Sequence, residues 1–413
     1  MTKKILLMDA YSTIHVGNGA LLDNTIKLAK IGFPDSEVII LSTDIETCKL
    51  QYNDVYKPMY GYFWRGLSGI KKYFWALKQV AHIGVQTLNQ FTFKISPEKL
   101  AFNNDQKNAI KKMMEADVCI SLSGENINDT FYQALYFWLF SYWFVILNGK
   151  KFILFPQSIG PLNNRFNRWI VYHALKNASL LVGRDQKSFE TLLSLGFEEK
   201  KVMFVPDVAI QQDIKSGINI HRYFSDHNKK VVGVTVSKIP SEIKTEVDYT
   251  QEVYNGLINS LANTEYKILL MPSNYIKNGV SEDYKLCTAL KERLSDNFEV
   301  AIIENKPHFS DEYKSLLIQL DLFISTRMHV SILATSGFTP TIAINTQHKI
   351  RGYMENIGMG NCCIEMNELN NLNNLISTVI VNRSNIRDDL ERGIKKLKLI
   401  QDLFIERLCK LND

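Results

Sequence analysis

The sequence lacks several patterns that would place it at once in a class of proteins. It has no clustered tail of Lys or Arg, and its formal net charge is only +5, so charge does not indicate nucleic-acid binding. Its six cysteines show no CxxC spacing, which predicts reduced, structural thiols rather than a disulfide framework. It also has no HExxH motif or other metal-ligand cluster of fixed spacing, so we expect no metal site.

The first residues are expected to form a strand and not a secretion signal. The apolar run after Lys3 and Lys4 breaks at Asp9, and no cleavage pattern of small residues follows, so Lys3 to Asp9 is predicted to be a first strand. A cytoplasmic protein is the expectation that follows. The hydrophobic content of 46% and the charged content of 22% are ordinary for a globular protein, and 413 residues favour two domains.

Only one apolar run is long enough to be considered as a membrane-spanning helix. Residues 131–148 contain no charged side chain, and the length of this run is at the lower limit for a membrane-spanning helix. The alternative is a helix buried against a sheet. The run follows Asp129, ends before Lys150 and Lys151, and leads directly into another apolar strand, so we favour the buried crossover helix.

Strands and helices alternate through both halves of the chain. Residues 211–230 lose this apolar periodicity, so the domain boundary is predicted there. The pattern predicts an α/β fold with two Rossmann-like domains facing across a cleft, residues 1–220 and 221–413, with the last helix packing back on the N-terminal domain. Strands are predicted at 3–9, 37–42, 179–182, 231–237, 267–272, 299–304, 322–325 and 341–345, with further strands in VCISLSGEN and KFILFPQSIGP.

An aromatic and basic stretch runs from Tyr56 to Lys94 and lacks clear strand signals. Aromatic rings beside Lys and Arg suit a membrane interface or a sugar-binding surface. The alternative is an ordinary helix whose aromatic side is buried against the sheet, and we favour it because an amphipathic face more often belongs to a core.

Two strand-to-helix turns carry an arginine where an anion is expected to bind. The stretch from Asp321 to Pro340 reads as a strand, a turn at Arg327 to His329, and a short helix stopped by a glycine. Such a turn points unpaired N–H groups and the positive helix end outward, Arg327 adds a charged fork, and His329 adds a titratable group. Arg184 follows another strand in the same way. Gly17 and Gly19 also follow a strand, in a loop that reads either as a phosphate cradle or as a tight turn.

Several motifs occur in an order that resembles the polysaccharide pyruvyl transferase family. They are SLSGENINDTF, FPQSIGP, VGRDQKSFETLLSLGF, VPDVA, and STRMHVSILATSGFTPTIAIN with HKIRGYMENIGM. The last is the most specific, and the resemblance extends from Met1 to Met359. Members resemble two-domain glycosyltransferases of GT-B architecture and transfer pyruvate from phosphoenolpyruvate onto two hydroxyls of a sugar as a ketal, with release of phosphate. The resemblance implies this fold and this reaction, with phosphoenolpyruvate as co-substrate and no cofactor.

The resemblance also implies roles for residues on the donor side. Arg327 and His329 match the arginine and histidine of the family's S-x-R-x-H element, with Arg327 on the donor and His329 as the catalytic general acid. Arg184 matches the family's arginine after a strand and is expected to bind the carboxylate or phosphate of the donor. The other residues expected to bind the donor are Met328, and Lys349 and Arg351 in a loop after the strand at 341–345.

On the acceptor side the sequence departs from the family pattern. The first loop, HVGNGALLDN, lacks the acidic residue of relatives, and their triple-glycine loop is reduced to Ser123-Gly124-Glu125. Both loops are expected to border the acceptor pocket, so the acceptor is expected to differ. The acceptor-side candidates are Asn18, Gly124, Glu125, Asp129, Gln157 and Asp185. The general base is expected among Glu125, Asp129, Asp185 and Asp207, and spacing does not choose between them.

Three functions follow as hypotheses. The first is a cytoplasmic pyruvyl transferase that modifies a glycan precursor of a capsule or exopolysaccharide. Its acceptor is expected to be lipid-linked, with residues 56–94 at the inner face of the cell membrane. The second is a GT-B glycosyltransferase that uses a nucleotide sugar, because a fold does not fix the donor. The third is a catalytically idle glycan-binding protein.

Overall fold

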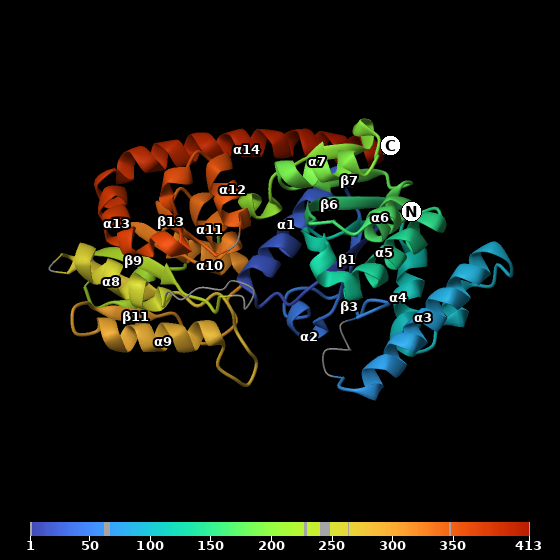
Figure 1. Ribbon diagram of the computed structural model, residues 1–413, viewed down its shortest axis with the longest axis horizontal. Helices are drawn as coiled ribbons and strands as arrows, with labels where there is room; N and C mark the ends of the chain where they lie inside the picture. The colour runs from blue at the N-terminus through green and yellow to red at the C-terminus, as the bar shows by residue number, and fades with distance from the viewer. Residues whose placement is uncertain are drawn as a thin grey trace. The chain divides into compact units, whose positions relative to one another are not determined.

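The chain divides into two compact α/β units. The computed structural model describes residues 2–61, 67–226, 229–239, 248–262, 264–346 and 348–412. The first unit contains residues 1–12, 21–208 and 401–413, and the second contains residues 13–20 and 209–400. Each unit is built on one parallel sheet, so the expected pair of Rossmann-like domains is confirmed. The chain passes from one unit to the other after Ser12 and after Val208, and also within two helices, α1 (Val16–Gly32) and α14 (Arg383–Asn412) (Figure 1).

The first unit has a parallel sheet in the order β3-β2-β1-β4-β6-β7-β8, and β5 pairs with β6 off this path. All but the first residue of β6 are buried, as expected for a parallel strand covered on both faces. The strands are β1 (Lys4–Ala10), β2 (Glu37–Ser42), β3 (Val55–Tyr56), β4 (Val118–Ser121), β5 (Gly124–Ile127), β6 (Lys151–Ile159), β7 (Leu180–Gly183) and β8 (Val202–Phe204). Besides α1 and α14, the helices are α2 (Ile45–Cys48), α3 (Ile70–Phe91), α4 (Asn104–Glu115), α5 (Tyr132–Leu147), α6 (Arg165–Leu175) and α7 (Gln186–Ser194).

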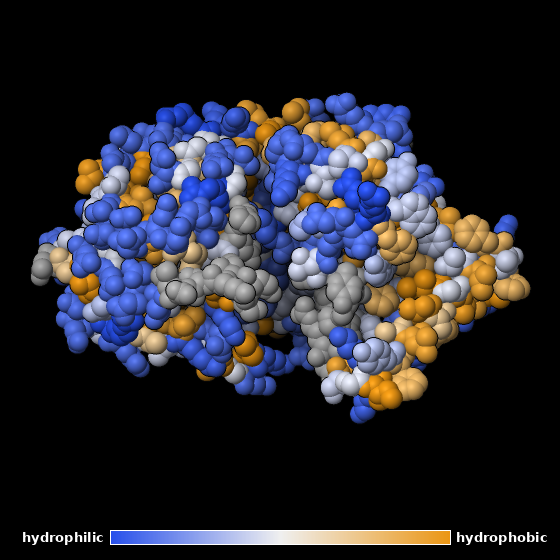
Figure 2. All heavy atoms as spheres, in the orientation of Figure 1, coloured by the Kyte–Doolittle hydropathy of each residue, from blue (hydrophilic) through white to orange (hydrophobic). Residues whose placement is uncertain are grey.

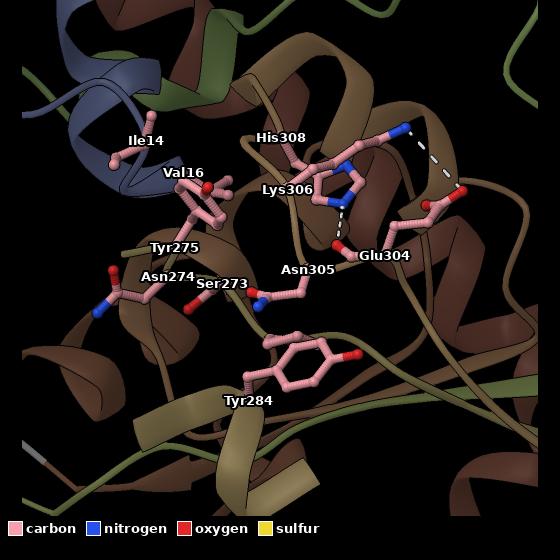
Figure 3. A pocket seen from close by; sticks show the side chains of 11 residues that line it. Ile14, Val16, Ser273, Asn274, Tyr275, Tyr284, Glu304, Asn305, Lys306 and His308 are labelled. Carbon is pink, nitrogen blue, oxygen red and sulfur yellow. Dashed lines mark hydrogen bonds and ion pairs between the residues drawn. The ribbon is translucent and has the colours of Figure 1, made fainter. Parts of the chain in front are cut away.

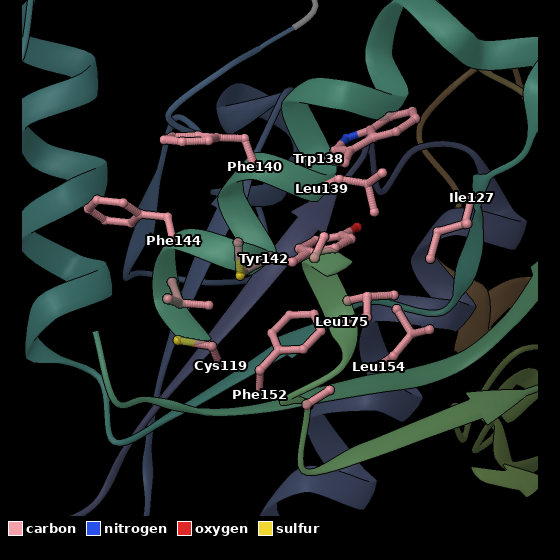
Figure 4. Packing of buried hydrophobic residues seen from close by; sticks show 14 of the residues in the cluster. Cys119, Ile127, Trp138, Leu139, Phe140, Tyr142, Phe144, Phe152, Leu154 and Leu175 are labelled. Atoms are coloured by element: carbon pink, nitrogen blue, oxygen red, sulfur yellow. The ribbon is translucent and has the colours of Figure 1, made fainter. Parts of the chain in front are cut away.

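The apolar run of residues 131–148 forms α5, which is buried in the core of this unit. Leu139, Tyr142 and Phe144 are buried, and the Tyr142 ring lies 4.9 Å from the ring of Phe152 on β6 (Figure 4). The predicted buried helix is therefore confirmed. No helix in the part of the chain that the structure describes is long and apolar enough to cross a membrane.

Two predicted loops in the first half are regular elements instead. Gly17 and Gly19 lie inside the first turn of α1 rather than before it, because the helix begins at Val16 and Gly19 N–H donates to the His15 carbonyl (3.0 Å). Residues around Gly124 form β5, because Gly124 pairs with Gln157 on β6 and extends the sheet. Both loop predictions were wrong for the same reason: long-range packing outweighs the local turn preference of glycine.

The second unit has a parallel sheet in the order β11-β10-β9-β12-β13-β14. In chain order this is 3-2-1-4-5-6, the strand order of a doubly wound Rossmann fold. The strands are β9 (Lys230–Thr235), β10 (Tyr266–Leu270), β11 (Val300–Ile302), β12 (Leu322–Ser325), β13 (Thr341–Asn345) and β14 (Cys363–Glu365). The helices are α8 (Tyr249–Leu261), α9 (Glu282–Leu294), α10 (Ser310–Leu317), α11 (Met328–Thr335), α12 (His348–Asn356) and α13 (Leu372–Val381).

Helix α3 lies in the aromatic and basic stretch, but its burial is the reverse of the prediction. Its buried side chains are polar: Gln79, His82, Gln86 and Asn89. The Nδ1 of His82 lies 2.7 Å from the Tyr60 hydroxyl, and Asn89 exchanges hydrogen bonds with the backbone of Ile95. Trp75 and Ile83 of α3 do pack partly on neighbouring apolar residues. The prediction of an aromatic side packed on the sheet was nevertheless wrong, because polar contacts hold α3 and leave most of its large apolar residues exposed. These are Ile70, Tyr73, Phe74, Leu77, Val80, Val85, Leu88 and Phe91.

Candidate functional site

The turn between β12 and α11 lies where the strand order of the second sheet reverses. Strands β9 and β12 are neighbours there, and their connections leave toward opposite sides of the sheet. Ligands of doubly wound proteins bind at such a switch point, beyond the carboxyl ends of the strands. The two strand ends are joined by a hydrogen bond between the hydroxyls of Ser237 and Thr326 (2.8 Å). The sequence around Arg327 is therefore placed where this fold binds ligands.

Arg327 presents a partly exposed guanidinium at this turn. Its Nη2 contacts both carboxylate oxygens of buried Asp283, at 2.8 and 3.2 Å, and Asp283 also accepts a hydrogen bond from Ser273 Oγ (3.1 Å). The side chain of Arg327 is 41% exposed, and its Nε has no hydrogen-bond partner among the described residues. Asp283 thus holds the guanidinium at Nη2, Nε is a buried donor without a partner among the described residues, and the exposed part of the side chain can face an anion.

His329 lies in the first turn of α11 and is packed against the first turn of α1. A Cβ added to Gly17 would lie only 2.8 Å from the Cβ of His329. Residues 13–20 belong to the second unit, and Val16 N–H donates to the Ser273 carbonyl (3.3 Å). Glycine at position 17 therefore permits a close approach that sets the position of the His329 side chain. Arg327 occupies the N-cap position of α11, and no side chain caps this helix.

A polar pocket in the second unit lies beside this turn. It is bordered by the ends of β10 and β11 and by the start of α1 (Figure 3). His308 Nε2 lies 2.9 Å from the Glu304 carbonyl, and burial lowers the pKa of His308, which favours the neutral ring. The pocket is connected to Arg327 through Ser273 and Asp283. Its lining includes Ile14, Val16, Ser273, Asn274, Tyr275, Tyr284, Glu304, Asn305, Lys306 and His308.

The other predicted donor residues of this half lie on or beside the same turn and on α12. Met328 is the first residue of α11. Lys349 and Arg351 lie in α12 and not in a loop as predicted, because the helix begins at residue 348. Burial lowers the pKa of Lys349 from 10.5 to about 8. Arg351 forms an ion pair with Glu365 and donates to the Cys363 carbonyl (2.8 Å), so its guanidinium joins α12 to β14.

Arg184 belongs to the first unit, where it is buried after β7. Its Nη1 lies 2.9 Å from Asp207 Oδ2, and its Nε donates to Ser158 Oγ (2.8 Å). The predicted donor arginine and one predicted base candidate thus form a buried ion pair with each other. Asp185, next in the chain, caps α7 by accepting from Ser188 N–H (2.8 Å).

The remaining acceptor-side candidates are spread over both units. Asn18 lies in the first turn of α1, within residues 13–20 of the second unit, whereas it was predicted for the N-terminal domain. Gly124 and Glu125 lie on β5, and Gly124 pairs with buried Gln157. Gln157 Nε2 donates to Ser121 Oγ (2.8 Å). Asp129 accepts from the backbone of residues 163 and 164 and from the side chain of residue 167, so it joins its loop to the start of α6.

Sequence reasoning missed Asp283, and it also missed Asp9 at the end of β1. Asp283 reads as an ordinary acidic residue in a first helical turn, and only the fold brings it to Arg327. Asp9 ended a predicted strand, and its buried contacts come from β4 and α5. Nowhere within the described ranges do three or more His, Cys, Asp or Glu side chains gather as a metal site would require.

Comparison with known proteins assigns this arrangement to a family. The family model described as polysaccharide pyruvyl transferase matches residues 15–348. The amylovoran biosynthesis protein AmsJ of Erwinia amylovora is 23% identical over 269 residues, which cover 62% of this chain and 64% of AmsJ. The match thus spans less than two thirds of the length of that relative.

Solved structures with the same architecture are distant in sequence. HepE from Anabaena, in complex with UDP and glucose, is 13% identical with a TM-score of 0.54, covering 99% of this chain and 100% of HepE. UDP-GlcNAc 2-epimerase from Neisseria meningitidis, bound to UDP-GlcNAc, is 10% identical with a TM-score of 0.57, covering 98% of this chain and 100% of the epimerase. At these identities the likeness shows the fold, and the predicted GT-B-like architecture is confirmed.

Proposed function

The chain belongs to the polysaccharide pyruvyl transferase family, and from that premise we propose that it transfers the pyruvyl group of phosphoenolpyruvate onto two hydroxyls of a sugar. The acceptor is a precursor of a surface polysaccharide, such as a capsule or exopolysaccharide. The observation that carries the proposal is that Arg327 and His329 lie together in the turn at the switch point of the second sheet. An anion-binding fork and a titratable ring lie two residues apart there, beside a helix N-terminus.

His329 supplies the proton in this reaction. Protonation of the methylene carbon makes the neighbouring carbon electrophilic, and a sugar hydroxyl attacks it. Phosphate then leaves, the second hydroxyl closes the ketal, and the two hydroxyl protons balance the new methyl hydrogen and the protonation of phosphate. Arg327 binds the anionic donor and stabilises charge on the departing phosphate. We propose that Arg184, Met328, Lys349 and Arg351 contribute to donor binding.

Phosphoenolpyruvate acts as a co-substrate in this proposal, and no resident metal or cofactor takes part. Arginine and lysine side chains can neutralise phosphate charge without a metal. Chelation with EDTA is therefore expected to leave the rate of phosphate release unchanged. A rate that falls with EDTA and returns with added magnesium would contradict this part of the proposal.

The test of the reaction is to supply phosphoenolpyruvate with candidate acceptor glycans. The expected products are inorganic phosphate and a glycan with the mass of an added pyruvate ketal. His329→Ala is expected to lose turnover severely while the protein stays folded by circular dichroism. Full activity in His329→Ala would remove the general-acid role.

The second candidate is a GT-B glycosyltransferase that uses a nucleotide sugar. It is favoured by one observation, namely that similar folds occur in proteins bound to UDP or UDP-sugars. Its signature is the release of a nucleoside diphosphate from a nucleotide sugar, with no phosphate from phosphoenolpyruvate. A glycan-binding protein would release neither product. Its His329→Ala variant would bind glycans as well as the wild type does.

We propose further that the acceptor is lipid-linked and that the enzyme works at the cytoplasmic face of the membrane, with α3 on the lipid surface. The exposed residues Tyr73 (76%) and Leu77 (65%) belong to an apolar face that Figure 2 shows over α3. Between Asp54 and Glu98 the sequence has six basic residues and no acidic one. Apolar and aromatic side chains flanked only by cations suit an anionic lipid surface.

Vesicle sedimentation tests this location. The protein is expected to sediment with phosphatidylglycerol vesicles and not with phosphatidylcholine vesicles. Leu77→Glu should weaken sedimentation about tenfold or more, because burying a leucine contributes about 1.5 to 3 kcal/mol. The matched control is Leu399→Glu, a similarly exposed leucine (59%) on α14, which should change nothing. Equal sedimentation of both variants would argue against α3 as the contact.

A further inference from the structure

The first turn of α9 carries a buried carboxyl group to the site of the second unit. Asp283 is the second residue of this helix, and only 1% of it is exposed. Ser281, the N-cap residue, accepts a hydrogen bond from Tyr284 N–H (3.2 Å). The Ser281 hydroxyl donates to the carbonyl of Asn274, which lies beside Ser273 after β10 (2.8 Å; Figure 3). The start of α9 is thus fixed on the segment that follows β10, and Asp283 is held inside the unit.

The carboxylate of Asp283 has one cationic partner among the residues that the structure describes. Nη2 of Arg327 lies 2.8 Å from its Oδ1 and 3.2 Å from its Oδ2. Ser273 Oγ donates to Oδ2 (3.1 Å) and brings no charge. An ionised carboxylate is costly to bury unless a cation and hydrogen-bond donors balance its charge. The burial of Asp283 therefore depends on where the Arg327 guanidinium lies, and the two side chains fix each other.

The Arg327 side chain runs from a fixed backbone to a fixed end group. Its N–H donates to Ser325 Oγ (3.1 Å), and Ser325 Oγ donates to its carbonyl (3.0 Å). At the other end Asp283 holds Nη2, although 41% of the side chain is exposed. An exposed arginine has many rotamers, and ordering one of them when a ligand binds lowers the affinity. An arginine that is already ordered avoids that loss.

We propose that Asp283 is a positioning residue of the donor site. It holds the guanidinium of Arg327 in one orientation before phosphoenolpyruvate binds, and it does so without touching the donor. The inference rests on the proposed function in one respect, namely that Arg327 binds the anionic donor. A carboxylate near an anion site also repels the anion, so the two effects of Asp283 on donor affinity have opposite signs. Positioning predicts that donor binding becomes weaker when the carboxylate is removed.

Asp283→Asn removes the charge and keeps the shape of the side chain. The dissociation constant of phosphoenolpyruvate, measured by calorimetry without an acceptor, should rise about tenfold, an ordinary coupling for two residues in contact. The matched control is Glu282→Gln on the same helical turn, because the Glu282 side chain is 57% exposed and pairs with Lys285. Its dissociation constant should equal that of the wild type. An unchanged or lower dissociation constant in folded Asp283→Asn would overturn the positioning role.

A double-mutant cycle separates positioning from a purely structural role. If Asp283 acts through Arg327, Asp283→Asn should change the dissociation constant less than about twofold in a protein that already carries Arg327→Gln. A purely structural carboxylate would lower the stability in urea unfolding and leave the dissociation constant unchanged in both backgrounds. An equal rise in both backgrounds would show that Asp283 affects the donor independently of Arg327, and it would overturn the inference.

Nitrogen NMR of the arginine side chains tests the orientation without any donor. The guanidinium signals of Arg327, assigned from their loss in Arg327→Lys, should show slow rotation about the Nε–Cζ bond in the wild type and in Glu282→Gln. Rotation should be fast in Asp283→Asn. Fast rotation in the wild type would overturn the positioning role, and this result does not depend on whether Asp283→Asn folds. Slow rotation in a wild type that binds no phosphoenolpyruvate would mean that the proposed donor fails while the hold of Asp283 on Arg327 stands.

Discussion

Replacing Gly17 by alanine should separate the stability of this protein from its activity. The added Cβ would lie 2.8 Å from His329 Cβ and 3.0 Å from both Cγ and Nδ1 of the ring. Ordinary contacts of a Cβ begin at 3.4 Å, so the imidazole or the helix start must move by about 0.6 Å. The clash is therefore directed at the residue that we propose as the general acid.

The effect on stability is expected to be small. Alanine in a helix is favoured over glycine by about 1 kcal/mol, whereas overpacking costs about 1 to 3 kcal/mol. The two terms oppose each other, and the net loss in the free energy of unfolding should be about 0 to 2 kcal/mol. The effect on catalysis should be larger in proportion, because a misplacement of about 1 Å lowers a rate on the order of 10²-fold. We expect kcat to fall about tenfold.

The assay combines urea unfolding with the rate of phosphate release from phosphoenolpyruvate. Gly84→Ala is the matched control, since Gly84 is also in a helix and an added Cβ would meet no atom within 4 Å. It should be slightly more stable than the wild type and fully active. Full activity in a stably folded Gly17→Ala protein would refute the argument that Gly17 positions His329.

Three further variants test the charged groups. Arg327→Lys should raise the KM for phosphoenolpyruvate about tenfold, because an ammonium cannot reproduce a two-pronged contact, and an unchanged KM would remove Arg327 from the donor site. The pKa of Lys349 is lowered from 10.5 to about 8 in the folded protein. Between these two pH values the unfolded chain therefore binds more protons than the folded chain, so this residue makes the free energy of unfolding rise with pH. The affinity for phosphoenolpyruvate should fall as the pH rises through about 8, and Lys349→Arg should abolish that fall. Measuring this affinity at a series of pH values tests the prediction. Asp207→Asn should lower the free energy of unfolding by about 3 to 5 kcal/mol, because it removes the carboxylate that balances the buried charge of Arg184, and a loss under 1 kcal/mol in urea unfolding would contradict this.

The sequence predicted those parts of the fold and of the site that depend on residues adjacent in the chain. The periodicity placed β2, β12 and β13 at their observed bounds, because parallel strands buried on both faces are continuous apolar runs. The turn at Arg327 was also predictable, since a strand end, a helix start and a charged fork are adjacent in the chain. A fold of alternating strands and helices then brings that turn to the switch point.

The remaining features depend on partners far away in the chain. The helical periodicity identifies the apolar face of α3, but it does not show which face of the helix contacts the rest of the protein. In the structure Tyr60 and Gln106 form hydrogen bonds with its polar face. Asp9 takes its hydrogen bonds from residues 112 and 133 positions later, so no local motif marks it. Arg184 has a motif, but its ion pair with Asp207 is visible only in three dimensions.

The discontinuous make-up of the first unit has a consequence for biosynthesis. Its final piece, residues 401–413, is translated only after the whole second unit, about 10 to 40 s after residue 208 at ordinary ribosome speeds. Phe404 packs on Phe155 of β6 (5.1 Å between ring centres), and Leu408 packs on α1 at Gly32. Until that piece arrives, apolar surface on the nascent first unit stays uncovered. Such an intermediate is a natural client for a chaperone that holds the chain during synthesis.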